Sequence, residues 1–263
     1  MTRIGSASEL RAYYDTIRAA NDGRWIDFEP IIQSIYERLL APGDTAIDGG
    51  ASAGRHTFPM ALKIAPNGTV FAFEPLRKFA WRLRAKTFVR HPQFRRVIRI
   101  QEVALSDWSG SAEFLVAEDP AYSGLRPRIY PRVDMRVRKR RVRVDTLDNL
   151  IQPSSPVRFL KLDLEGGEFD AMRGGVRLIE THRPVIAFEY DRWHTPQFYG
   201  FQHADLLEFL ERLGYRILDI LGIPFDDRSL WDAAEVWYYL ALPRERELEP
   251  AILEAIESRR EPH

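Results

Sequence analysis

Short apolar runs that alternate with amphipathic segments constrain the fold of this chain more than any other feature of its sequence. Five of these runs follow the break at Pro42-Gly43, and they are Thr45–Ile47, Val70–Phe73, Val97–Ile100, Phe159–Leu162 and Val185–Phe188. The segments beside them are Pro59–Ile64, Phe79–Val89, a less regular stretch over 101–150, and Phe169–Ile179. Apolar runs separated by helices are typical of a parallel sheet that is covered on both faces.

The two ends of the chain complete this α/β pattern. Apolar residues spaced three or four apart predict helices within the first forty residues and over Ala204–Leu213. Two further strands are expected at Tyr215–Leu221 and Val236–Leu242. We therefore expect one domain over residues 1–263, made of a helical extension (1–42), a sheet-based core (43–243) and a helical tail (244–263).

The composition excludes several classes of site and location. The chain contains no cysteine, which rules out a cysteine-based zinc site or a thiol nucleophile and fits a reducing compartment. Its 38 Lys and Arg residues balance its 38 Asp and Glu residues, so we expect no general attraction to nucleic acid or to a membrane. No stretch approaches the roughly 20 apolar residues of a membrane span, and the N-terminus lacks the apolar core of a signal peptide. We expect a cytoplasmic protein.

The segment Asp48–Gly54 has the composition of a ligand-binding turn. It follows a short strand, leads into a helix, and consists mainly of small residues that let the backbone approach a ligand closely. Open α/β sheets bind ligands at the carboxyl ends of their strands, where this turn is expected. The candidate cofactor-binding residues are Asp48, Gly50, Ser52 and Gly54. A tight turn that binds no ligand is the alternative.

Glu74 closes the next apolar run and can accept hydrogen bonds from both hydroxyls of a ribose, although it could also be a strand-end residue in solvent. Together with the turn it indicates an adenosine-type ligand. The two features do not separate S-adenosylmethionine from a dinucleotide, since Gly49-x-Ala51-x-x-Gly54 passes as a loose dinucleotide fingerprint. The Asp48 carboxylate favours the sulfonium compound, because it would repel a pyrophosphate and attract a cation.

A second group of motifs carries a family resemblance. The segments are Val144–Leu150, Phe159–Glu168, Met172–Gly175 and Pro184–Glu189, and the string from Lys161 to Glu168 is the most specific of them. Over Thr45–Glu189 the chain resembles the FkbM family of S-adenosylmethionine-dependent methyltransferases, which carries a TLD segment and a K-[ILV]-D-[ILV]-E-G-x-E motif. The turn also matches the family's D-x-G-A-N-x-G pattern, with Ser52 in place of Asn.

This resemblance implies a Rossmann-like class I methyltransferase fold. The sheet would have seven mostly parallel strands with an antiparallel last strand, Val236–Leu242, and helices on both faces. The implied reaction is methyl transfer from S-adenosylmethionine to a hydroxyl, usually of a sugar, a glycan or a secondary metabolite. The resemblance places Glu74 at the ribose of the donor, and Glu102, Val103 and Ala104 near its adenine.

Acidic residues at the ends of the fourth and fifth expected strands are the candidates for catalysis. A sugar hydroxyl is a weak nucleophile that gains from a general base. We expect this base to be Asp163, Glu189 or His194, because burial and neighbouring like charges raise the pKa of a carboxyl toward the working range. We expect Glu165 to bind the substrate, although acidic residues are also common at helix starts, and His194 could be a surface residue. Asp163 and Glu189 could hold Mg²⁺, an alternative that we do not favour.

Arg126–Arg143 contains nine Lys or Arg residues in eighteen positions. It lies between the adenine segment and the catalytic strand, so it could form a lid in which Arg138 and Arg140 bind a phosphate-bearing or lipid-linked acceptor, or an anionic membrane surface. Trp193 could stack on a sugar ring. A hairpin with solvated charges, and an aromatic residue that packs the domain edge, are the alternatives. We expect no nucleic-acid partner.

Two other functions compete with methyl transfer. One is an NAD-dependent oxidoreductase that acts on a sugar nucleotide, which Asp48 and the missing third glycine of a strict fingerprint disfavour. The other is a non-catalytic nucleotide-binding module. The polar residues retained at strand ends, Asp48, Glu74, Asp163 and Glu189, argue against such a module.

Overall fold

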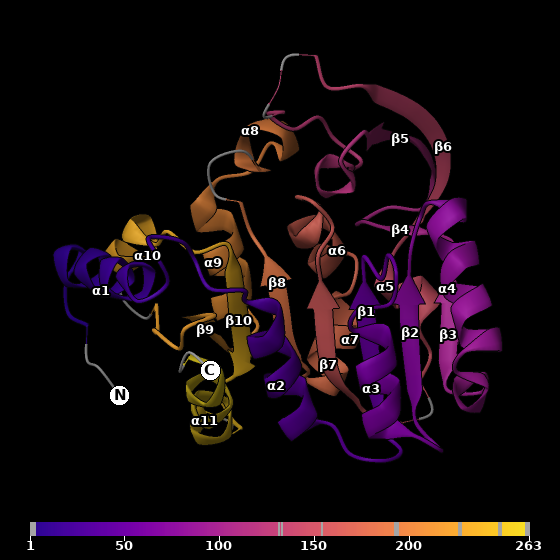
Figure 1. Ribbon diagram of the computed structural model, residues 1–263, viewed down its shortest axis with the longest axis horizontal. Coiled ribbons are helices and arrows are strands. Elements are labelled where there is room, and N and C mark those ends of the chain that lie inside the picture. The colour runs from indigo at the N-terminus through magenta and orange to yellow at the C-terminus, as the bar shows by residue number, and fades with distance from the viewer. Residues whose placement is uncertain are drawn as a thin grey trace.

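A seven-stranded sheet forms the centre of the molecule (Figure 1). The computed structural model describes residues 4–130, 132, 134–153, 155–191, 195–225, 228–246 and 249–260. The strand order is β3-β2-β1-β7-β8-β10-β9. The bounds are β1 Thr45–Gly49, β2 Thr69–Phe73, β3 Ile98–Gln101, β7 Val157–Leu162, β8 Val185–Glu189, β9 Tyr215–Asp219 and β10 Tyr238–Pro243. All seven strands predicted from apolar runs are confirmed.

The strand directions bring polar residues to one edge of this sheet. Strands β3, β2, β1, β7 and β8 are parallel, whereas β10 pairs antiparallel with both β8 and β9, which confirms the expected antiparallel last strand. In this register Asp48 lies beside Lys161, and Tyr238 at the start of β10 lies beside Glu189 at the end of β8. The carboxyl ends of the parallel strands and the amino end of β10 therefore meet at the same edge.

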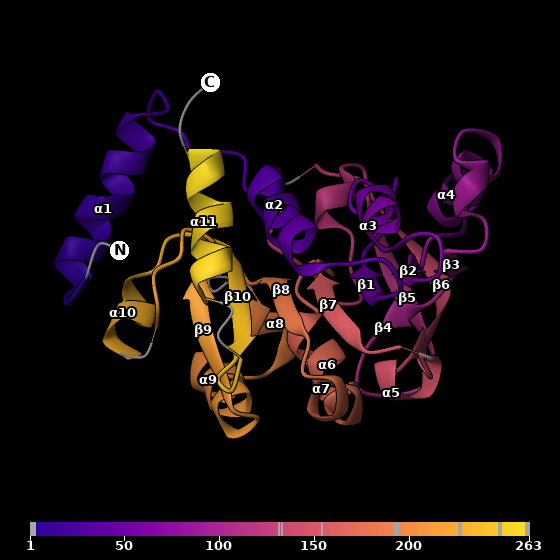
Figure 2. The same ribbon diagram turned by 90° about the horizontal axis from the view of Figure 1, so that it is seen from below.

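Helices cover both faces of the sheet, as Figure 2 shows. On one side lie α2 Glu29–Leu39, α3 Thr57–Ile64, α4 Arg77–Val89 and α11 Glu249–Arg260. On the other lie α5 Leu147–Leu150, α6 Glu168–Arg173, α7 Val176–His182 and α9 His203–Arg212. The remaining helices are α1 Ala7–Ala19, α8 Thr195–Tyr199 and α10 Arg228–Ala233, with 3-10 turns η1 Pro92–Phe94 and η2 Pro120–Tyr122.

The terminal helices pack onto the sheet rather than standing apart from it. In α1, the buried Tyr14 hydroxyl donates to Asp219 at the end of β9, over 2.8 Å. Helix α11 packs against α2 and buries Ile252 and Ile256 in the main hydrophobic cluster. The same cluster reaches from Leu10 in α1 to Ile256, so the ends of the chain contribute to one continuous core. None of the helices within the described ranges is long and apolar enough to cross a membrane.

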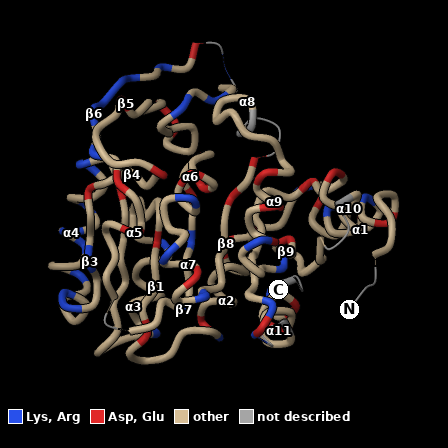
Figure 3. Tube along the Cα trace, turned by 180° about the vertical axis from the view of Figure 1, so that it is seen from behind, with Lys and Arg blue, Asp and Glu red and all other residues tan. Residues whose placement is uncertain are grey.

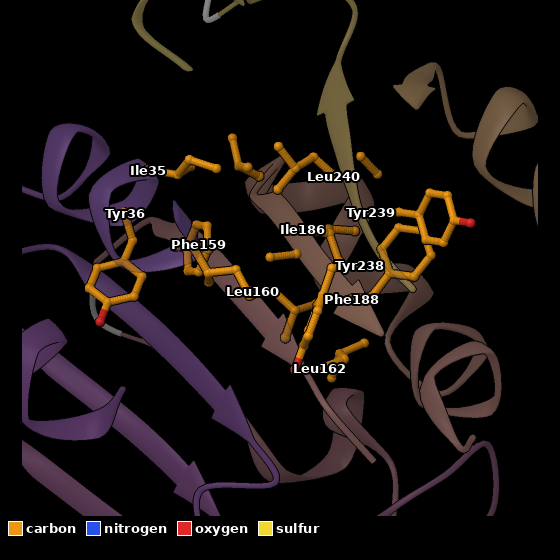
Figure 4. Packing of buried hydrophobic residues seen from close by; sticks show 14 of the residues in the cluster. Ile35, Tyr36, Phe159, Leu160, Leu162, Ile186, Phe188, Tyr238, Tyr239 and Leu240 are labelled. Atoms are coloured by element: carbon orange, nitrogen blue, oxygen red, sulfur yellow. The ribbon is translucent and has the colours of Figure 1, made fainter. Parts of the chain in front are cut away.

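The central strands are apolar on both faces, as strands between two helical layers must be. Figure 4 shows the side chains of β7, β8 and β10 packed together, with Tyr36 of α2 near Phe159. The rings of Tyr36 and Phe159 are 5.5 Å apart. Lys161 is an exception within β7, because it is a charged residue and yet only 2% exposed. A buried ammonium of this kind requires nearby carboxylates, and it marks the position of the site.

The stretch over 101–150 differs from the less regular amphipathic segment that we expected. It forms a second sheet in the order β4-β6-β5, with bounds β4 Ala104–Leu105, β5 Gly110–Ala117 and β6 Val137–Asp145. Within β6, Val142 and Val144 flank Arg143 with the period of two that a strand requires, and both valines are buried, whereas the four basic residues from Arg138 to Arg141 are exposed. The hairpin alternative for the basic segment therefore holds from Val137 onward.

Candidate active site

The turn after β1 ties together the ends of three strands. The backbone N–H groups of Gly50 and Ala51 donate to the carbonyl oxygen of Phe73 at the end of β2, over 3.0 and 2.9 Å. Gly50 has a φ of +81°, and a Cβ there would lie 1.9 Å from the carbonyl oxygen of Asp163, which follows β7. Only glycine fits this close approach, which explains why the predicted turn needs a glycine at this position.

A cavity of about 260 Å³ opens beside this turn, and we name it the first cavity. One wall is formed by Gly50, Ser52 and Glu74, three residues that we expected to bind a cofactor. Val103 and Ala104, which we expected near an adenine, also line it. Its apolar side chains come from both sheets and from α4, and they include Leu76, Phe79, Leu105, Phe114 and Leu125. The cavity is thus polar at the strand ends and apolar farther out.

Glu74 is held rigidly at the end of β2. Its carboxylate accepts hydrogen bonds from the backbone N–H groups of Ser52 and Leu76, over 3.0 and 2.8 Å. Burial raises the pKa of Glu74 to about 7, an effect that the two N–H donors oppose and the charge of Asp48 reinforces. A ligand that donates further hydrogen bonds to this carboxylate would favour its ionised form.

Three of the expected cofactor-binding residues do not line the first cavity. Asp48 is 1% exposed; its Oδ2 accepts a hydrogen bond from Thr57, and its Oδ1 has no hydrogen-bond partner within the part of the chain that the structure describes. Glu102 faces away and pairs with Arg84 at 3.4 Å. Gly54 shapes the start of α3, where a Cβ would lie 2.6 Å from Phe58. These three residues therefore lie outside the lining of the first cavity.

A larger cavity of about 680 Å³, which we name the second cavity, adjoins the first. Its lining combines acidic and aromatic side chains with a single arginine. The acidic residues are Asp27, Glu29, Asp163, Glu165, Glu189 and Asp191, the aromatic residues are Phe28, Tyr122, Tyr130, Trp237 and Tyr238, and the arginine is Arg128. Asp163 and Glu165 line both cavities, so they lie where the two spaces meet.

Asp163, Glu165 and Glu189 form a carboxylate cluster in which one oxygen from each lies within 4.8 Å of the others. Burial, followed by repulsion from Asp163 and Glu165, raises the pKa of Glu189 well above its ordinary value. Burial and the charge of Asp163 also raise the pKa of Glu165, to about 9, although Arg128 opposes the shift. Burial and mutual repulsion therefore oppose three full negative charges in this cluster.

Asp163 is the member of this cluster that stays ionised. Its Oδ2 accepts hydrogen bonds from Lys161 Nζ and from the Tyr238 hydroxyl, each over 2.9 Å. Burial works to raise the pKa of Asp163, but the Lys161 ammonium outweighs it and holds the pKa below the ordinary value. Two candidates named from the sequence, Asp163 and Glu189, are thus brought together by the fold, and Glu189 also hydrogen-bonds to Asp163.

A line of buried polar groups extends from Asp163 toward α2. The Tyr238 hydroxyl lies 3.3 Å from Glu29 Oε1, and the other oxygen of Glu29 contacts His56 Nε2. His56 Nδ1 is in turn 3.2 Å from the hydroxyl of Tyr36. Glu29 and His56 could not be predicted from the sequence, because Glu29 begins α2, His56 precedes α3, and no local motif links them. Tyr238 had a usable signal, since the expected hairpin places the start of the last strand at this edge.

Arg128 is a further residue that the sequence analysis did not single out within its basic segment. Its guanidinium pairs with Glu165 and lies 3.3 Å from Asp191, and it sits 5.9 Å from the ring of Tyr122. Two of the three clustered carboxylates thus contact a cationic side chain, since Lys161 pairs with Asp163 and Arg128 pairs with Glu165. The three carboxylates are the residues that could hold a metal ion.

The remaining predicted residues are not part of this arrangement. Arg138 and Arg140 are exposed on β6 and are absent from the linings of both cavities. Trp193 and His194 lie outside the described residues, so their expected roles stay predictions. Glu165, expected to bind the substrate, is at the junction of the two cavities and has a left-handed φ of +57°. A strained backbone of this kind in a non-glycine residue is common at functional sites.

Comparison with known proteins places the chain in a family. The family model of the methyltransferase FkbM domain matches residues 48–217, nearly two thirds of the chain, from the end of β1 through β7 and β8 into β9. Among the curated proteins, none matches the sequence.

The chain is also similar to solved structures at low identity. A methyltransferase FkbM from Methylobacillus flagellatus KT is 16% identical with a TM-score of 0.45, and the match covers 89% of this chain but 60% of that one. An O-methyltransferase from Bacillus cereus, solved in complex with SAH, is 12% identical with a TM-score of 0.43, and the match covers 92% and 93%. A putative rRNA-methylase from Clostridium thermocellum is 14% identical with a TM-score of 0.45, covering 80% and 90%.

Proposed function

Because the chain belongs to the FkbM family of S-adenosylmethionine-dependent methyltransferases, we propose that it methylates a hydroxyl group of a sugar, a glycan or a secondary metabolite. The observation that carries this proposal is the junction of two unlike cavities at Asp163 and Glu165. Methyl transfer is a direct displacement, and it requires the acceptor oxygen and the leaving sulfur to lie on opposite sides of the methyl carbon. Two adjoining cavities with a shared carboxylate wall provide this geometry.

The first cavity suits the donor. Glu74 would accept hydrogen bonds from the ribose hydroxyls, and the apolar wall with Val103 and Ala104 would receive the adenine. Gly50 and Ser52 in the wall of this cavity would lie beside the amino-acid part of the donor. Its positively charged sulfur would then lie near the Asp163 carboxylate, which favours a sulfonium over a pyrophosphate.

The second cavity suits a polyhydroxylated acceptor. Aromatic rings such as Tyr122 and Trp237 offer flat apolar surface, and the carboxyl groups offer acceptors and donors for hydroxyls. Among the described residues of its lining, six are acidic and one, Arg128, is basic, so an acceptor bound wholly inside it would be neutral or cationic. A phosphate on the acceptor would have to remain outside this cavity.

Asp163 is the residue that we propose as the general base, acting as an ionised carboxylate whose pKa is lowered and not raised as we expected from the sequence. The acceptor oxygen attacks the methyl carbon, the carbon–sulfur bond breaks, and the sulfonium becomes a neutral thioether. The hydroxyl proton passes to the Asp163 carboxylate, which Lys161 and Tyr238 keep ionised and oriented. Glu189, whose pKa is raised well above its ordinary value by burial and the neighbouring carboxylates, would hydrogen-bond to the acceptor or to Asp163.

Calorimetry with S-adenosylhomocysteine and NADH tests the donor half of this proposal. We expect S-adenosylhomocysteine to bind at one site per chain and NADH to bind at least a hundredfold more weakly. Gly50→Ala should abolish the binding because its Cβ would collide with the backbone of Asp163. The matched control is Gly23→Ala, at another left-handed glycine with nothing within 4 Å of an added Cβ. Tighter binding of NADH would exclude the methyltransferase assignment.

A further inference from the structure

The Lys and Arg residues of this neutral chain are concentrated in two segments. Nine of the 38 lie in residues 75–101 and another nine in 126–143, and Asp134 is the only acidic residue in the two segments together. The first segment contains α4 and β3, and the second contains β6. Of the described Lys and Arg residues in these two segments, only Arg128 lines the first or the second cavity.

The fold brings these segments to the same end of the molecule. Leu76, which precedes α4, packs against Phe114 and Val142 of the second sheet. Figures 1 and 2 both show α4 and β6 at the β3 end of the sheet, and Figure 3 shows basic residues along both. We call the exposed surface of α4 and β6 the basic edge.

Many cations of the basic edge have no ion pair within the described part of the chain. Lys139 pairs with Glu113 and Arg143 with Asp145 on β6. The exposed residues with no such pair are Arg77, Lys78, Arg82, Arg90, Arg138, Arg140 and Arg141, the last of which hydrogen-bonds to Ser111. In the hairpin register Arg138 and Arg140 lie opposite Val116 and Phe114, so both belong to the face that also carries the small apolar cluster. These charges are available to a partner.

Helix α4 also exposes an apolar stripe between its cations. Trp81, Ala85 and Val89 are four residues apart and therefore lie on one face of the helix. Trp81 is 66% and Val89 79% exposed, and together with Arg82, Lys86 and Arg90 they line a shallow hollow. The opposite face, with Ala80 and Leu83, is buried in the protein. A helix with basic residues around an exposed tryptophan suits the interface of a membrane, where the ring lies among the headgroups.

We propose that the basic edge docks this protein on the surface of an anionic bilayer. The unpaired cations would meet lipid phosphates, and Trp81 and Val89 would enter the headgroup region. A bilayer explains the apolar stripe, which an RNA backbone would leave unused. This inference concerns the location of the protein and is independent of the reaction.

Vesicle flotation tests the proposal with the full chain. Vesicles of phosphatidylcholine with 30% phosphatidylglycerol should bind the protein at 50 mM salt at least tenfold more tightly than pure phosphatidylcholine, and 500 mM salt should release it. Arg82→Glu/Arg90→Glu and Arg138→Glu/Arg140→Glu should each weaken binding at least tenfold. Trp81→Ala should weaken it while its salt dependence remains. Melting temperatures of all variants establish that they fold.

The matched control is Arg11→Glu/Arg24→Glu, which changes the net charge equally at exposed sites on and after α1. We expect it to bind vesicles as the unmodified chain does. Equal binding of the two vesicle types, or an equal loss in the control, would overturn the proposal. So would tighter binding of a 20-nucleotide single-stranded RNA than of anionic vesicles at the same salt.

Discussion

Lys161 combines two properties that rarely occur together in one side chain: it is 2% exposed, and it carries a charge. Burial lowers the pKa of this ammonium, but the carboxylates of Asp163, Asp48 and Glu29 more than compensate and raise it. The Lys161 ammonium is therefore the counterion of these three carboxylates. Its hydrogen bond to Asp163 links the stability of the core to the state of the candidate base.

Replacing this counterion should destabilise the fold. Lys161→Met keeps the volume but leaves buried carboxylates uncompensated, and we expect a loss of about 3–5 kcal/mol in the free energy of unfolding. Urea denaturation measures this loss. Lys78→Met, at an exposed position of α4, should change the same quantity by less than about 0.5 kcal/mol. Equal stability of the two variants would show that Lys161 is not needed as a counterion.

Asp163→Asn tests the proposed base. The amide can still receive the hydrogen bonds of Lys161 and Tyr238 at its oxygen, but it cannot take the acceptor proton. We expect kcat for methyl transfer to a pyranoside acceptor to fall by about 10²-fold or more, with less than a tenfold change in affinity for S-adenosylhomocysteine. Asp119→Asn, which changes an exposed aspartate, should leave kcat unaltered. Unchanged turnover by Asp163→Asn would remove Asp163 from the role.

Glu74 gives donor binding a pH dependence. Its pKa of about 7 lies above the ordinary 4.5, and ribose hydroxyls would bind the ionised form, so donor affinity should fall as pH drops below 7, by up to about tenfold per unit. Folding has the opposite sign, because the stability that Glu74 contributes is full below pH 4.5 and is lost as pH rises through 7. Calorimetry with S-adenosylhomocysteine between pH 5.5 and 8 should show a slope in the unmodified chain and a flat profile in Glu74→Gln. A slope that persists in Glu74→Gln would assign the titration to another group.

At the scale of elements, the sequence predicted what depends on local pattern. Apolar runs predicted all seven strands of the main sheet, and the small residues after β1 predicted the turn. For the second sheet the sequence offered only a hairpin within the basic segment, as an alternative, because most of β6 is a run of exposed basic residues and its partner β5 lies in another part of the chain. The site residues Glu29, Arg128 and Tyr238 were missed for a similar reason. Each reaches the carboxylate cluster from a distant element, through pairings that no short motif encodes.

The second sheet should contribute to donor binding through Phe114 of β5, which is 7% exposed and lines the first cavity. Phe114→Ala removes an aromatic wall from the adenine end, and we expect about a tenfold loss of affinity for S-adenosylhomocysteine. Leu115→Ala, at the next position on the other face of β5, should leave affinity within about twofold. Calorimetry distinguishes them. Equal affinities for the two variants would mean that the second sheet only covers the core.

For the whole molecule, a net charge of zero conceals a separation of charge. The carboxylates gather around the second cavity, whereas the Lys and Arg residues gather on the basic edge. This division is consistent with a cationic donor in the interior and an anionic partner outside. The expected division into one domain with terminal extensions, and the cytoplasmic location, stay predictions. The fold adds to these predictions the arrangement of the two cavities, which adjoin at the carboxyl ends of the parallel strands.

A crystal structure with bound S-adenosylhomocysteine tests the central claim most directly. We predict that its adenosine occupies the first cavity with the ribose hydroxyls on Glu74, and that its sulfur faces the second cavity beside Asp163. A ligand seated elsewhere, or one whose sulfur points away from Asp163, would contradict the proposed meeting of donor and acceptor.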